Sequence, residues 1–391
     1  MNGQERVLKA INHEEPDRVP AWESAFTNNT IAKHYGMKPT AGDYGISALK
    51  KVPNKDEVLK TFLKQKNLLK AGYQYSFELY RRMGFDIGTC ITSLFPRKIL
   101  DDASGFVDEY GRTMKFERYE KDGTTILGYY GGYFKSFEDY ESWEDLDPNW
   151  EPRLNGFLAG KEVQEEMHDE IFAVPSTGAL MECTWEGFGI QTFSKLMRNH
   201  AQAKKVFDDR GKFTLELVKI LIENGAKMVL LWDDYGFKNG LFMRPEHYRN
   251  YIFPWIKRMC DVAHKQDSKI LLHSDGDLIE IFEDIVNCGV DVLNPIESTT
   301  ANPEYDIFKL HEKYGDKLTF CGNLSPVMLA TGEISEIEAY AKKLIRELAP
   351  GGGYIFSSGH SINPAVTIDR FEAMQNIKRK YGNYPIGDIP D

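Results

Sequence analysis

Polar residues that can bind a metal follow two of the apolar runs in the second half of the chain. The clearest group is His273-Ser274-Asp275, which ends the run KILLHSD. In an extended strand residues i and i+2 point to the same side, so this imidazole and carboxylate can converge on one point. A second imidazole is available from His360, at the end of YIFSSGH. Two histidines and one carboxylate form a set typical of a zinc site with an open position. The pattern therefore predicts a metal site at His273, Asp275 and His360.

A purely structural explanation of the same residues stays open. Asp275 precedes GDLIEIFEDI, a segment of helical pattern, and an aspartate there can cap the helix. His273 can equally be a hydrogen-bonded residue at the edge of the fold.

Three more polar residues end neighbouring runs and are candidates for catalysis. Asp234 ends MVLLWDD, Glu297 ends VDVLNPIE, and Asn323 lies near the end of LTFCGNLS. Asp233 and Asp234 are adjacent, so we expect at most one of them to face a site, and the pair can instead cap the following loop. Glu297 is a candidate acid or fourth metal ligand, or else a residue that holds a ligand in place.

Large aromatic residues also fall near the expected strand ends. They can line a pocket for a planar substrate, although aromatic residues more often belong to a core. The candidates for substrate binding are Trp22, Trp185, Trp232 and Tyr235.

The segments that must position these residues follow a regular rhythm. After residue 165, six short apolar runs alternate with segments of helical pattern, and VPAW and FDIGTCI bring the number of expected strands to about eight. Buried strands alternating with helices predict a parallel α/β sheet, and the strand count favours a (β/α)8 TIM barrel over a doubly wound sheet. No GxGxxG follows a strand, which argues against a dinucleotide site. We expect a single domain over 1–391, with a β-rich excursion at about 105–134.

The composition excludes several classes of partner. A net charge of −11 and a pI near 5.4 provide no basic field for nucleic acid or an anionic membrane. No apolar run approaches the length of a transmembrane helix, and the first residues do not have the pattern of a signal peptide. The five cysteines are widely spaced and form no CxxC pair, as expected of free thiols in a reducing, cytoplasmic compartment. The oligomeric state is left open, with a homodimer as one option.

Several long motifs carry a family resemblance. From about residue 4 to 381 the chain resembles the uroporphyrinogen decarboxylase-like superfamily, whose members are (β/α)8 barrels with a funnel-shaped site at the carboxyl ends of the strands. The motifs that carry the resemblance are ERVLKAINHEEPDRVP, WDDYGFKNGLFMRPEHYRNYIFPWIKR, LLHSDGDLIEIFEDIVNCGVDVLNPIE, FCGNLSPVMLATGEISEI and LAPGGGYIFSSGHSINPAV.

Two branches of this superfamily differ in their chemistry. True decarboxylases hold the acidic side chains of their substrate with a pair of arginines near the N-terminus. The corresponding segment here, VPAWESAFTNNTIAKHYG, contains no arginine. Carboxylates without cationic partners are costly to bury, so the departure argues against uroporphyrinogen decarboxylase activity.

The other branch transfers methyl groups to or from a cobalamin protein with the help of zinc. Its thiol-using members have a His-x-Cys pair followed by a later cysteine. In this chain, which resembles them, Asp275 and His360 stand where the two cysteines are expected. A metal held by nitrogen and oxygen is harder than one held by thiolates, which suits the oxygen of a methoxylated substrate, as in O-demethylation, better than a thiol acceptor. The chain has no DxHxxG motif, so the cobalamin is expected on a separate corrinoid protein.

Two alternatives to the methyltransferase remain at this stage. One is a decarboxylase or lyase acting on a tetrapyrrole or a small carboxylic acid. The other is a barrel that only binds a tetrapyrrole or a corrinoid partner.

Overall fold

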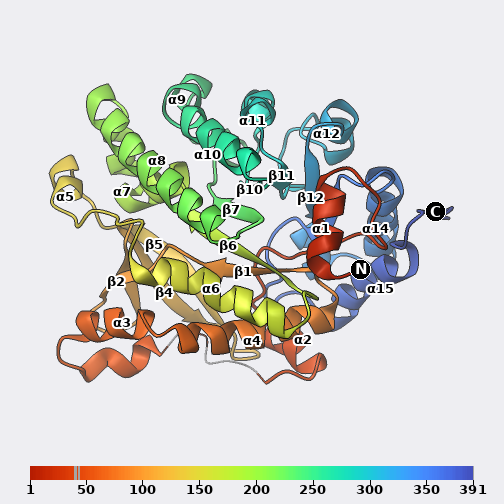
Figure 1. Ribbon diagram of the computed structural model, residues 1–391, viewed down its shortest axis with the longest axis horizontal. Helices are drawn as coiled ribbons and strands as arrows, with labels where there is room; N and C mark the ends of the chain where they lie inside the picture. The colour runs from red at the N-terminus through yellow and green to blue at the C-terminus, as the bar shows by residue number, and fades with distance from the viewer. Residues whose placement is uncertain (39–41, 43–44, 391) are drawn as a thin grey trace.

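A parallel sheet forms the centre of the protein in the computed structural model, which describes residues 1–38, 42 and 45–390 (Figure 1). Within these residues the sheet has seven strands in the order β1-β6-β7-β10-β11-β12-β13, and every neighbouring pair is parallel. The strands are β1 (Ile87–Ile91), β6 (Phe172–Gly178), β7 (Met228–Trp232), β10 (Lys269–His273), β11 (Val292–Asn294), β12 (Thr319–Leu324) and β13 (Tyr354–Ser358).

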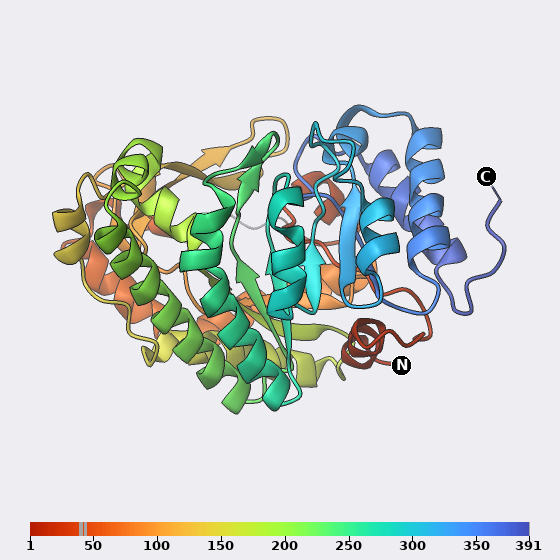
Figure 2. The same cartoon turned by 90° about the horizontal axis from the view of Figure 1, so that it is seen from above.

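Helices cover the outer face of this sheet (Figures 1 and 2). Every residue of β6, β11, β12 and β13 is buried, as expected of strands with helices on one side and a filled lumen on the other. The α-helices are α1 (Gly3–Ile11), α2 (Asn29–His34), α3 (Lys55–Leu63), α4 (Lys66–Met83), α5 (Phe137–Glu141), α6 (Glu151–Glu166), α7 (Met181–Leu196), α8 (His200–Glu223), α9 (Pro245–Tyr251), α10 (Phe253–Lys265), α11 (Phe282–Cys288), α12 (Ile307–Tyr314), α13 (Pro326–Thr331), α14 (Ile334–Leu348) and α15 (Ile368–Tyr381). Two 3-10 turns, η1 (Ile46–Lys51) and η2 (Ile279–Ile281), complete the described helices.

The VPAW segment lies between the two edge strands of the sheet. Phe356 of β13 donates from its N–H to the carbonyl of Pro20 at 2.8 Å and accepts from the N–H of Trp22 at 3.1 Å. On the other side, the N–H of Asp86, just before β1, donates to the carbonyl of Ala21 at 2.8 Å. The segment thus occupies the eighth position and closes the barrel predicted from the sequence, whereas a doubly wound sheet has open edges.

This eighth position is not a regular strand, contrary to the prediction for VPAW. Its isolated bridge joins Ala21 to Phe356 alone. Pro20 has no N–H to donate, so a continuous ladder of backbone hydrogen bonds cannot form along this segment.

Buried charges fasten the seam between this segment and β1. Asp86 is fully buried and accepts from Arg6 Nη1 at 2.7 Å, from Arg18 Nη2 at 2.7 Å and from the N–H of Ala21 at 2.8 Å. The N-terminal segment is therefore bound to the barrel by paired and hydrogen-bonded charges as well as by its backbone.

A second sheet leaves the barrel between β1 and α5. It is antiparallel, in the order β2-β3-β4-β5, and includes β2, which begins earlier than the β-rich excursion predicted at about 105–134. It packs with α3 and η1 around a hydrophobic cluster of its own, at the end of the molecule opposite α14 and α15 (Figure 2). The strands are β2 (Pro96–Ile99), β3 (Gly105–Asp108), β4 (Arg112–Arg118) and β5 (Thr125–Gly132), and β8 (Gly236–Phe237) and β9 (Gly240–Leu241) form a separate short hairpin. Among the described helices, none has both the length and the apolar composition needed to span a bilayer.

Candidate metal and active site

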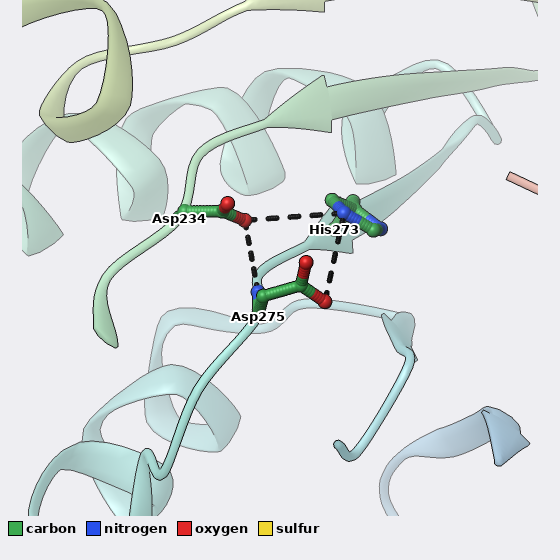
Figure 3. A group of neighbouring side chains, drawn as sticks. All are labelled: Asp234, His273 and Asp275. Atoms are coloured by element: carbon green, nitrogen blue, oxygen red, sulfur yellow. Dashed lines mark hydrogen bonds and ion pairs between the residues drawn. The ribbon is translucent and has the colours of Figure 1, made fainter. Parts of the chain in front are cut away.

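Three polar side chains meet at the carboxyl ends of β7 and β10 (Figure 3). Asp234, His273 and Asp275 each offer a ligand atom, and these atoms all lie within 4.8 Å of one another. The Nε2 atom of His273 is 3.9 Å from Asp234 Oδ1 and 3.9 Å from Asp275 Oδ1. One imidazole and two carboxylates at this spacing form a donor set suited to a divalent cation.

The register of the two strands explains why these residues converge. In the parallel pair of β7 and β10, Trp232 lies opposite His273. Asp234 and Asp275 each follow by two residues, so they occupy equivalent positions on adjacent strand ends. The N–H of Asp275 donates to Asp234 Oδ1 at 2.8 Å, which ties the two strand ends together.

The neighbouring Asp233 turns away from this group. Its Oδ1 atom accepts from the N–H of Met181 at 2.6 Å and of Glu182 at 3.0 Å, at the start of α7. Burial raises the pKa of Asp233 to about 7. As expected, one of the two adjacent aspartates faces the site, but the other contacts the start of α7, earlier in the chain, and not the following loop.

The group has the features of a site for a cation. Asp275 Oδ1 is buried and has no hydrogen-bond partner among the described residues. Burial, followed by the charges of Glu182 and Asp275, raises the pKa of Asp234 well above its ordinary value. Bringing carboxylates together in this way is unfavourable unless a proton or a metal ion compensates them. The residues present therefore fit a metal with nitrogen and oxygen ligands.

His360, expected as the second imidazole, lies at the edge of this group. Its Nε2 atom is 3.4 Å from Asp275 Oδ2, but 54 % of its side chain is exposed and its Nδ1 contacts the Ser361 hydroxyl at 2.9 Å. The structure thus gathers Asp234, and not His360, with His273 and Asp275.

Asp275 is not the helix cap that the sequence left open. The N–H of Ile279, at the start of η2, donates to Asp277 Oδ1 at 3.1 Å. The carboxylate of Asp277 is thereby used in local structure, and that of Asp275 stays directed toward His273 and His360.

Glu297 and Asn323 support neighbouring backbone. Glu297 Oε2 accepts from the N–H of Gly276 at 2.9 Å, and the Thr299 hydroxyl donates to Oε1, so Glu297 fixes the turn that follows Asp275. The amide of Asn323 donates to the carbonyl of Ile296 at 2.8 Å and accepts from the Tyr340 hydroxyl at 2.9 Å. Neither belongs to the group of possible metal ligands.

The four aromatic candidates lie at different depths. Trp232 packs edge-on against His273, with ring centroids 4.7 Å apart. Trp22 is fully buried, 6.3 Å from Trp232, and Tyr235 is fully buried against Tyr248.

Trp185, on α7, is half-buried and stacks on Phe242 at 5.0 Å. Trp185 and Trp232 are thus partly accessible, whereas Trp22 and Tyr235, also expected to line the pocket, lie beneath the surface as core.

An ionic cluster centred on Arg112, here called the Arg112 cluster, joins the antiparallel sheet β2-β3-β4-β5 (the excursion sheet) to α7, and it was not expected from the sequence. Arg112 Nε contacts Asp108 Oδ2 at 2.6 Å, and its Nη1 contacts Glu182 Oε1 at 3.2 Å and Glu186 Oε2 at 3.0 Å. The i, i+4 spacing of Glu182 and Glu186 places both on one face of α7. Nothing in the sequence pairs them with an arginine about 70 residues away.

The charge of Glu186 leads to a testable dependence of stability on pH. Burial, followed by the charge of Glu182, raises the pKa of Glu186 to about 8. Between its ordinary range near 4.5 and pH 8 the folded protein binds more protons at this site than the unfolded chain, so stability falls as pH rises through this window. We expect Glu186→Gln to remove this loss, with a gain of roughly 1.4 kcal/mol or more at pH 8.5 relative to pH 5. Urea unfolding of both proteins at the two pH values measures it, and an unchanged difference would contradict it.

The fold and this group of residues define a β/α-barrel protein with a polar site at the carboxyl ends of its strands. The family model for uroporphyrinogen decarboxylase (URO-D) matches residues 133–381, and the chain belongs to that family.

The similar proteins fall into two kinds. The chain is 29% identical over 174 residues to a uroporphyrinogen decarboxylase of Coxiella burnetii (strain RSA 493 / Nine Mile phase I), covering 43% of this chain and 45% of that protein. It is 25% identical over 186 residues to the uroporphyrinogen decarboxylase of Geobacter sulfurreducens, covering 46% of this chain and 51% of that one. The matches thus span about half the length of these relatives.

A solved structure described as a methyltransferase from Methanosarcina mazei is similar over almost the whole chain. It covers 97% of this chain and 99% of its own, with a TM-score of 0.65 and 16% sequence identity. The two proteins therefore share a fold.

Proposed function

We propose that this protein is a methyltransferase that moves a methyl group between a small, methoxylated substrate and the cobalt of a separate corrinoid protein. The observation that carries the proposal is the group formed by Asp234, His273 and Asp275, in which Asp275 Oδ1 is buried without a hydrogen-bond partner among the described residues. The fold shared with a methyltransferase over almost the whole chain supports it.

These three residues would hold a zinc ion, with His360 beside them. Zinc would supply Lewis-acid chemistry at the ether oxygen of the methyl donor. The protein's own contribution is to hold the ligands ready. Glu297 fixes the turn after Asp275, and the Asp275 N–H holds Asp234 in place.

The aromatic residues would orient the substrate. Trp232 lies against His273, and Trp185 and Phe242 provide a stacked pair. A leaving alkoxide or phenolate needs a proton, and Glu186 is protonated near neutral pH because burial raises its pKa to about 8. In its ionised form Glu186 also raises the pKa of Asp234, so we propose that the Arg112 cluster borders the site.

The names of the relatives make decarboxylation of a carboxylate-rich tetrapyrrole the second candidate. The charges near the site disfavour it. The charge of Glu182 already raises the pKa of Asp234, and the nearby Arg112 already contacts three acidic side chains. A further carboxylate brought to this position would lack a cationic partner.

The deciding experiment follows the spectrum of cobalt. The purified protein is mixed with a corrinoid protein reduced to Co(I) and a panel of methoxyaromatic compounds, with a uroporphyrinogen decarboxylation assay run alongside. We expect conversion to methyl-Co(III) with at least one donor, loss of conversion after chelation of metal, and its return with Zn²⁺.

A matched pair of variants controls for a general effect of losing a histidine. His264 pairs with Asp291 at 3.0 Å on the surface, so His264→Ala should retain conversion and His273→Ala should lose it. Decarboxylation without any methyl transfer would overturn the proposal.

A further inference from the structure

Asn294 holds the imidazole of His273 from the side opposite the two aspartates. It lies directly across from His273 in the pair of β10 and β11, and its side chain is buried. His273 Nδ1 and Asn294 Oδ1 are 2.7 Å apart. The amide nitrogen of Asn294 donates to the carbonyl of Cys321 at 3.0 Å and approaches the Cys321 sulfur at 3.4 Å.

The Cys321 carbonyl determines which way this amide points. A backbone carbonyl can only accept a hydrogen bond, so the NH₂ group of Asn294 must face Cys321 and its oxygen must face His273. Burial raises the pKa of the Cys321 thiol, so the sulfur stays a neutral, weak partner and does not compete with the carbonyl.

The orientation of the amide in turn fixes the tautomer of His273. An amide oxygen has no hydrogen to donate, so the contact at 2.7 Å requires the hydrogen of the neutral imidazole to be on Nδ1. The lone pair of the ring is then on Nε2, the atom that lies 3.9 Å from both Asp234 and Asp275. The Trp232 ring packed edge-on against the imidazole restricts its rotation.

We propose that Asn294 is a positioning residue: it fixes His273 in the Nδ1–H tautomer so that the Nε2 lone pair faces the two aspartates and is ready to bind a cation. The inference that His273 binds a cation rests on the proposed function, whereas the inference about its tautomer rests only on the hydrogen bonds. The chain of contacts runs across three adjacent strands, from β12 through β11 to β10, so the ligand is set by the rigid sheet.

The effect on metal binding is tested by Zn²⁺ competition titrations. We expect Asn294→Ala to weaken binding 10- to 100-fold. Asn294→Asp keeps an oxygen acceptor for Nδ1–H, and we expect its affinity to stay within about tenfold of the wild type. Equal affinity of the wild type and Asn294→Ala would overturn the role in metal binding.

A matched control is available at the other end of the barrel. Gln164 is also a buried amide; it accepts from the N–H of Ala173 at 2.7 Å and donates to Asp169 at 2.8 Å, beside the start of β6. Gln164→Ala removes similar hydrogen bonds and should leave the Zn²⁺ affinity unchanged. A loss equal to that of Asn294→Ala would mean that general destabilisation, and not the imidazole, causes the effect.

The tautomer is read separately, in the metal-free wild-type protein, from the ¹⁵N shifts of labelled histidine, with the His273 signal assigned by its absence in His273→Gln. We expect the Nδ1–H form, and the Nε2–H form would overturn the proposal. Failure of the wild type to bind Zn²⁺ would instead overturn the metal-assisted function, and the NMR measurement would still decide the role of Asn294.

Discussion

Asp275→Asn is expected to lower the affinity for Zn²⁺ by at least about 100-fold, equal to about 2.7 kcal/mol, because it replaces an anionic ligand with a neutral, weakly binding amide. Asp275 Oδ1 is buried without a hydrogen-bond partner among the described residues, so neutralising it breaks no structural contact of that atom. The fold should therefore persist, and the Tm of the metal-free protein should not fall. Competition with a chelator measures the Zn²⁺ affinity, and thermal unfolding measures the Tm.

Asp277→Asn serves as the matched control two residues along the same loop. Its carboxylate accepts from the N–H of Ile279, and an amide oxygen can still accept this hydrogen bond, so the substitution should leave both the stability and the Zn²⁺ affinity nearly unchanged. If both variants lose the metal, or if neither does, the assignment of Asp275 as a ligand is wrong.

Asp86→Ala is expected to destabilise the folded protein by about 3–5 kcal/mol. The substitution leaves Arg6 and Arg18 without their common buried partner and also removes the acceptor for the N–H of Ala21. These contacts hold the seam of the barrel, so the loss should appear as a lower midpoint of urea unfolding.

The control for this effect is Asp17→Ala. Asp17 contacts the same Arg6 at 2.6 Å, but 42 % of its side chain is exposed. Solvent screens a carboxylate exposed to this degree, so we expect a smaller loss than at Asp86, and a loss at Asp17 as large as that at Asp86 would contradict the importance of burial.

The sequence predicted the barrel because its strands are continuous apolar runs, a signal that depends only on local composition. It predicted the convergence of His273 and Asp275 for the same reason, since the i, i+2 alternation is a property of one strand. Asp234 was expected near the site but not as a partner of His273. Its position depends on the register of β7 against β10, which no local pattern reveals.

Other features depend on contacts that a local pattern cannot indicate. The VPAW segment has the composition of a strand, yet Pro20 limits it to isolated hydrogen bonds. Tyr235 follows a strand end, but its ring turns into the core against Tyr248. The Arg112 cluster joins the excursion sheet to α7, and only the fold brings these segments together.

The closure of the barrel by the VPAW segment has a consequence for folding during synthesis. Phe356, which binds Pro20 and Trp22, is made more than 300 residues after them, so the β13 side of this closure cannot form until β13 has left the ribosome. Contacts between such distant residues close slowly, because the entropy of a long loop must be overcome first. Until then Pro20 and Trp22 lack their partner in β13, whereas Ala21 and Asp86 on the β1 side are both made early. The growing chain therefore exposes sheet edges for most of its synthesis, the interval in which binding by a chaperone would matter most.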